Sequence, residues 1–121
     1  MTYKLRYTSL SENDLLRVKE EVFEASKSID VTERYLDDFL TKIEKKKDFP
    51  FSGTPLYYGD YFTGFYFVHF KEYNAFYRIN DDCMEVLRVL SSKSDYIRIL
   101  LGEYYIDDIE TYSQDLNEGK E

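Results

Sequence analysis

Three runs of aromatic and β-branched residues, separated only by short turns, constrain the fold more than any other feature. They cover Tyr61 to Phe70, Tyr73 to Ile79 and Cys83 to Leu90. Lys71-Glu72 and Asn80-Asp81-Asp82 between them have turn chemistry. Strands joined this tightly pair with their neighbours, so we predict an antiparallel meander. A parallel arrangement of these strands would count against the prediction.

The segments on either side of the meander predict one further strand, three helices and a loop. Tyr3 to Tyr7 alternates apolar and charged residues and predicts a strand. Ser11 begins a capping-box pattern, and Asp30 begins a second one, so we predict two helices joined as a hairpin. Residues 49–55 contain two prolines and a glycine and are expected to form a loop. Ser92 to Asp95 should cap a last helix that Gly102 ends.

The order β–α–α–β–β–β–α predicts an α+β fold, in which an N-terminal strand and a helical hairpin accompany the meander. We expect one domain over residues 1–101 and an acidic extension over residues 102–121, partly helical and then frayed. Tyr105, Ile106, Ile109 and Tyr112 favour a further amphipathic turn or two.

The charge is unevenly divided between these two parts. Of the net charge of −8, residues 1–101 carry −2, from 17 acidic and 15 basic residues. Residues 102–121 carry −6, from seven acidic residues and Lys120. A nucleic-acid-binding domain usually has a positive excess, which this chain lacks, although a local patch stays open.

Other function classes are disfavoured by composition. The single cysteine, Cys83, excludes an internal disulfide and favours a reducing compartment. With one histidine, His69, and no metal-binding motif, we expect no metal and no cofactor. The absence of a signal-peptide pattern or a membrane-spanning stretch predicts a cytoplasmic protein with no membrane partner.

The strand sequences resemble the RelE/ParE toxin superfamily. Tyr73 to Asp82, followed by Val86-Leu87-Arg88-Val89-Leu90, is similar to the family pattern Y-x-x-F-Y-R-I-x-D … I-L-R-V-L. Tyr3, Tyr7, Thr8 and Asp14 agree with its opening. The resemblance covers about residues 2–101 and is closer to the ParE branch.

The resemblance implies the toxin of a bacterial type II toxin–antitoxin, or plasmid stabilisation, system. It implies protein–protein interaction with a cognate antitoxin. The target would be a macromolecule such as DNA gyrase. The alternatives are a ribosome-dependent, metal-independent endoribonuclease acting on messenger RNA, or a toxin-like interaction module without toxicity. The sequence leaves open whether the chain is an enzyme, and it leaves the oligomeric state open.

An endoribonuclease of this kind needs cations to stabilise the phosphorane and a group that transfers protons. The resemblance places Asn74, Ser91 and Ser92 where basic residues are expected, which counts against that activity. The weak catalytic candidates are Arg78, Arg88, Lys93, Arg98 and His69. Each has an ordinary alternative: Arg78 and Arg88 pairing with acids, His69 packed or hydrogen-bonded, and Lys93 and Arg98 solvating a helix. Tyr73, Tyr77 and Tyr96 are candidates for target or antitoxin binding, with a place at the core boundary as the alternative.

Overall fold

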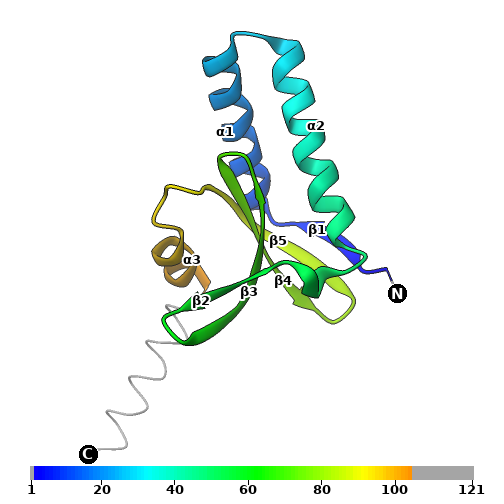
Figure 1. Cartoon of the computed structure of the whole chain (residues 1–121), viewed down its shortest axis with the longest axis vertical. Coiled ribbons are helices and arrows are strands. Elements are labelled where there is room, and N and C mark those ends of the chain that lie inside the picture. Colours follow the sequence, from blue (N-terminus) through cyan, green and yellow to red (C-terminus); the bar gives the residue numbers. More distant parts are fainter. Residues whose placement is uncertain (1, 105–121) are drawn as a thin grey trace, which may run out of the picture.

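The strands form one five-stranded sheet in the order β1-β5-β4-β3-β2, with helices on both faces (Figure 1). The computed structural model describes residues 2–104. The elements are β1 (Lys4–Tyr7), α1 (Ser9–Ser26), α2 (Ile29–Lys46), the 3₁₀ turn η1 (Pro50–Ser52), β2 (Thr54–Tyr58), β3 (Tyr61–Phe70), β4 (Tyr73–Asn80), β5 (Cys83–Ser91) and α3 (Tyr96–Tyr104).

The predicted meander is confirmed. β3, β4 and β5 pair antiparallel in sequence order. Lys71 and Asp81 adopt the left-handed conformation in the two turns, with φ of 52° and 55°. The α+β fold class is therefore confirmed as well.

The sequence predicts a loop over residues 49–55, but the last two of these residues belong to a strand. Thr54–Tyr58 forms β2, an edge strand paired antiparallel with β3. Pro55 conceals this strand in the sequence because proline is poor in central strands. An edge strand tolerates proline, since one row of its N–H groups needs no partner.

The partner of the N-terminal strand is not predicted from the sequence. β1 runs parallel to β5, with Tyr7 opposite Val86. The long crossover through α1, α2 and the meander makes a parallel pair possible, since only tight turns force strands to be antiparallel.

The helix ends differ from the predicted ones. Thr8 caps α1, because its Oγ1 accepts the backbone N–H of Ser11 at 3.1 Å, and Ser28 caps α2 in the same way. Each cap lies before the predicted one and uses a hydroxyl. Gly102 does not end α3, which continues to Tyr104. The predicted turns from Tyr105 onward lie outside the described residues.

Each face of the sheet carries its own apolar cluster. On the hairpin face, α1 and α2 cover a cluster that includes Phe39, Tyr77 and Val86. On the opposite face, α3 covers a cluster that includes Phe76, Leu87 and Leu90. Figure 1 shows α1 and α2 side by side, with α3 on the other side of the sheet. The sheet is therefore the middle layer of three.

A register shift between β4 and β5 places the neighbouring residues Leu87 and Arg88 in different surroundings. Tyr77 lies opposite Val86 and Phe76 opposite Arg88, so Leu87 is the extra residue of a β-bulge. Leu87 packs in the cluster under α3. Arg88 instead reaches the carboxylates of α1 and α3.

The edge of β5 beyond β1 is covered by polar groups of α1. β1 stops at Tyr7, whereas β5 continues to Ser91. Thr8 Oγ1 donates to the Leu87 carbonyl at 2.9 Å, and Asp14 Oδ2 accepts the Val89 N–H at 2.9 Å. Backbone groups that would otherwise lack a strand partner are thus satisfied by the first two turns of a helix.

Asp14 joins this edge to Arg88, whose side chain is 12% exposed. Its carboxylate is 2% exposed and accepts both Nε and Nη2 of Arg88, at 2.6 and 3.0 Å. Arg17 Nη2 lies 3.2 Å from Asp14 Oδ1, and Arg88 Nη1 also donates to Glu103 on α3. One carboxylate therefore connects α1 and β5, and through Arg88 also α3. We call Asp14, Arg17, Arg88 and Glu103 the Asp14 network.

Gly53 is required by a close approach rather than by its backbone angles. A Cβ atom at this position would lie 1.9 Å from the hydroxyl oxygen of Tyr77. Tyr77 is fully buried and its hydroxyl donates to the Pro50 carbonyl. The loop before β2 is thereby held against the sheet by one phenol.

We predict that Gly53→Ala lowers the free energy of unfolding by about 1–3 kcal/mol, because the added methyl group collides with Tyr77. Chemical denaturation measures the change. The same substitution in a Tyr77→Phe background should cost less, since the colliding oxygen is gone. Gly102→Ala is the control: it meets open space in a helix and should stabilise by about 0.5–1 kcal/mol. Equal effects at Gly53 and Gly102 would contradict the explanation.

We predict that Asp14→Ala lowers the free energy of unfolding by about 3–5 kcal/mol, because it removes the carboxylate that accepts from Arg88 Nε and Nη2 and from the buried Val89 N–H. Asp37→Ala, at an exposed position of α2, should change it by less than about 0.5 kcal/mol. Denaturant titration of both variants decides. A cost under about 1 kcal/mol for Asp14→Ala would show that the network adds little.

Candidate partner-binding site

Aromatic side chains gather on the surface where η1 meets β2 and β3. We call this the aromatic surface: Tyr3, Phe49, Phe51, Tyr57, Phe62 and Tyr66. The distance between ring centres is 6.3 Å from Tyr3 to Phe51, 6.1 Å from Phe51 to Tyr66 and 5.4 Å from Tyr66 to Phe62. Tyr57 continues the series, 5.6 Å from Phe62. Five of the rings therefore form one connected series, and Phe49 lines the same hollow as Tyr3 and Phe51.

Several of these rings face solvent. Phe49 is 74% exposed, Phe51 62% and Tyr57 51%. The two phenylalanines are exposed because Pro50 between them takes the buried position of η1. Exposed large apolar side chains that gather in this way make the aromatic surface a candidate for binding a partner. The sequence interpretation missed this set, although Phe49-Pro50-Phe51 in a predicted loop was a usable signal.

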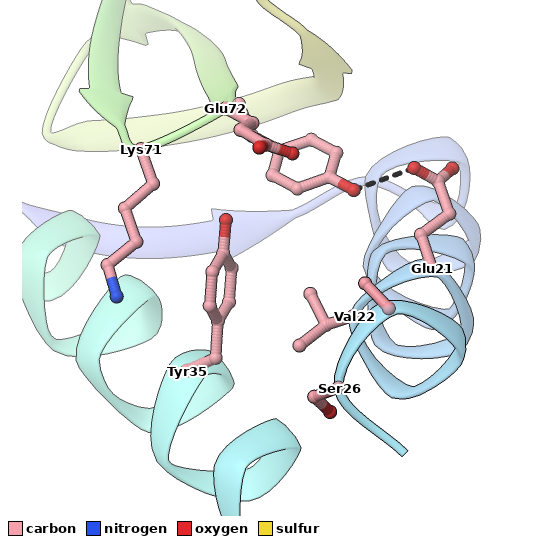
Figure 2. A pocket seen from close by; sticks show the side chains of 8 residues that line it. Glu21, Val22, Ser26, Tyr35, Lys71 and Glu72 are labelled. Atoms are coloured by element: carbon pink, nitrogen blue, oxygen red, sulfur yellow. Dashed lines mark hydrogen bonds between the residues drawn. The ribbon is translucent and has the colours of Figure 1, made fainter. Parts of the chain in front are cut away.

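A second concave site lies between the helical hairpin and the β3–β4 turn. We call it the hairpin groove. It has a volume of about 440 Å³ and is lined by Glu21, Val22, Ala25, Ser26, Tyr35, Lys71, Glu72 and Tyr73. Figure 2 shows the side chains of α1, α2 and the turn pointing toward this space. Rings and carboxylates from different elements thus line the same groove.

Tyr73 lies at the floor of this groove. It is 5% exposed, and its hydroxyl donates to Glu21 Oε2 at 2.7 Å. Burial, and then the Glu21 carboxylate, raise the pKa of Tyr73 well above its usual range. Burial also raises the pKa of Tyr35. Both phenols therefore stay neutral and serve as hydrogen-bonding and ring surfaces.

The predicted partner-binding tyrosines differ in accessibility. Tyr73 reaches the hairpin groove, as described. Tyr96 is half-buried on α3 and packs on Phe76, 5.1 Å away. Tyr77 has no exposed surface, which disagrees with the predicted role in binding, because a fully enclosed ring cannot touch a partner. Burial raises the pKa of Tyr77 as well.

The two strand arginines are paired with acids, as the alternative interpretation proposed. Arg78 Nε lies 2.9 Å from Glu85 Oε1, and Arg6 Nε lies 3.2 Å from Glu85 Oε2. These three residues are in register across β4, β5 and β1. Arg88 belongs to the Asp14 network. Neither arginine is presented to solvent as an isolated charge.

Lys93, Arg98 and His69, the remaining catalytic candidates, do not belong to these ion pairs. Lys93 is exposed in the loop between β5 and α3, and Arg98 is exposed on α3. His69 is exposed near the end of β3, and its Nδ1 lies 2.7 Å from Asn74 Oδ1. Since an amide oxygen only accepts, the Nδ1 of His69 carries the proton in this contact. His69 is therefore hydrogen-bonded, as its ordinary alternative proposed.

The polar residues that replace the expected basic ones have structural partners. Asn74 is 4% exposed and holds His69. Ser92 donates from its N–H and its Oγ to the Glu72 carbonyl, at 2.8 and 3.1 Å. Ser91 Oγ accepts the Lys93 N–H at 3.2 Å. These residues fasten the β3–β4 turn and the β5–α3 loop.

Within residues 2–104, no group of three His, Cys, Asp or Glu side chains is placed to hold a metal ion. No helix in the same range is long and apolar enough to cross a membrane.

The chain is similar to known toxins in sequence and in fold. Residues 5–96 match the family described as the ParE toxin of the type II toxin–antitoxin system parDE. No curated protein sequence matches the chain. The structure titled "Chromosomal ParDE TA system from P. aeruginosa" has a TM-score of 0.62 at 12% identity, covering 74% of this chain and 96% of that chain.

A second structure is the RelBE2 toxin–antitoxin complex from Mycobacterium tuberculosis. Its TM-score is 0.56 at 20% identity, covering 78% of this chain and 95% of that chain. These low identities show a shared fold, whereas the family match spans most of the described residues and includes β1 to β5. The chain therefore belongs to the ParE toxin family of type II toxin–antitoxin systems, within the RelE/ParE superfamily.

Proposed function

We propose that the chain is a bacterial growth inhibitor that acts by binding a protein target, with DNA gyrase as the first candidate. A cognate antitoxin would restrain it. The observation that carries this proposal is the pairing of the strand arginines. Arg78 is bound to Glu85, and Arg88 is bound to Asp14 and Glu103. Cations held by carboxylates are poorly suited to stabilise a phosphorane. We therefore favour a toxin that acts by binding its target over a toxin that cleaves RNA.

The aromatic surface supports the same proposal. Aromatic residues are enriched where proteins bind other proteins, and a few of them carry most of the binding energy. Phe49 is the most exposed of the set and precedes the buried Pro50 of η1. The surface can therefore be tested at Phe49 with little disturbance of the core.

Expression of the chain without an antitoxin should stop growth and cause filamentation with a DNA-damage response. In a purified assay the chain should inhibit supercoiling by gyrase and leave ribosome-bound messenger RNA intact. Normal supercoiling together with messenger cleavage would replace the proposal by the endoribonuclease alternative. Harmless expression, also of a chain truncated after Gly102, would favour the interaction module without toxicity.

Phe49→Ala should weaken gyrase inhibition about tenfold or more if the aromatic surface contacts the target, as expected for a central aromatic contact. Ile29→Ala is the matched control, because Ile29 is 65% exposed at the far end of the helical hairpin. Thermal melts should show both variants folded. Equal inhibition by both variants would place the contact elsewhere.

A further inference from the structure

The hairpin groove combines an aromatic wall with carboxylates. Tyr35 from α2 and Tyr73 from β4 supply the rings, and Glu21 from α1 and Glu72 from the turn supply the carboxylates. Val22 and Ala25 add apolar surface from α1. A volume of about 440 Å³ lies within the roughly 300–1,000 Å³ typical of pockets that hold a small ligand. One long side chain of a partner would fit the groove.

The charged groups at the groove are of both signs. Glu21 accepts from Tyr73 and lies 3.6 Å from Arg17 Nε, with its side chain 50% exposed. Lys71 is the one cation among the lining residues. Its Nζ lies 4.9 Å from the centre of the Tyr35 ring and 5.4 Å from that of Phe70. In the view of Figure 2, Lys71 lies on one side of the Tyr35 ring, and Val22 lies on the other.

Burial is the main cause that raises the pKa of both phenols, and the Glu21 carboxylate raises the pKa of Tyr73 further. At Tyr35 the backbone of Glu72 lowers the pKa, whereas the Glu72 carboxylate raises it. Glu72 is exposed in the turn, so its carboxylate can turn toward a ligand. The contact between Lys71 and Tyr35 also shows that this ring accepts a cation on its face.

We propose that the hairpin groove receives the guanidinium group of an arginine from an antitoxin segment. The planar group would stack on the face of Tyr35 opposite Lys71, between this ring and Val22. It would pair with the exposed Glu72 and with the half-exposed Glu21, which also accepts from Tyr73. A guanidinium suits this site better than an ammonium, because it stacks on rings and pairs with carboxylates at the same time. This inference rests on the proposed function, since it names the chemistry by which the antitoxin is recognised.

The test uses the isotope-labelled full chain and Nα-acetyl-arginine methylamide as the probe. A titration followed by nuclear magnetic resonance should shift the amide signals of Tyr35, Glu72 and Tyr73 in a saturable way. The neutral isostere, Nα-acetyl-citrulline methylamide, should leave them unchanged. Equal shifts with both compounds, no shift with either, or tighter binding of Nα-acetyl-lysine methylamide would overturn the proposal.

Two pairs of variants locate the site. Glu72→Gln should weaken probe binding at least about threefold, because it removes an exposed charge next to the ligand. Asp60→Asn, which removes one charge from the β2–β3 turn, should leave binding unchanged. Tyr35→Phe should retain binding and Tyr35→Leu should lose at least about half of it, since only the former keeps the ring. Unchanged binding by Glu72→Gln and Tyr35→Leu would overturn the assignment.

The growth and gyrase assays contain no antitoxin. A chain that arrests growth but ignores the arginine probe would therefore refute this inference alone. A chain that binds the probe but leaves growth and gyrase untouched would refute the proposed target alone.

Discussion

The contact between Asp14 and the open edge of β5 is the constraint on which the other features depend. β1 is too short to pair with the whole of β5, so α1 must supply acceptors and donors to the strand. The same carboxylate neutralises Arg88, which the β-bulge in β5 turns toward it. With α1 fixed in this way, α2 follows through the hairpin, and both helices are held over the sheet.

This constraint also bears on function. An arginine at this position of a toxin sheet could serve chemistry, but here its guanidinium is committed to α1 and α3. Arg78 is committed to Glu85 in a similar manner. The candidates for partner binding are instead the aromatic surface beside η1 and the hairpin groove with its rings and carboxylates.

The sequence predicted what depends on local patterns. The meander followed from dense β-forming runs and turn residues, and the pairing of Arg78 and Arg88 followed from their place on strands. It could not give β2, because Pro55 removes the local strand signal while the tertiary edge position tolerates it. Nor could it give the parallel partner of β1 or the burial of Tyr77, since both depend on contacts between distant residues. The exposure of Phe49 and Phe51 depends in turn on Pro50 taking the inward position.

Hydrogen exchange at the Val89 amide tests the central role of Asp14 most directly. If Asp14 closes the edge of β5, this N–H exchanges only when the whole domain unfolds, and its free energy of exchange equals that of global unfolding. Exchange as rapid as that of an open strand edge, in a domain that is otherwise folded, would contradict the account.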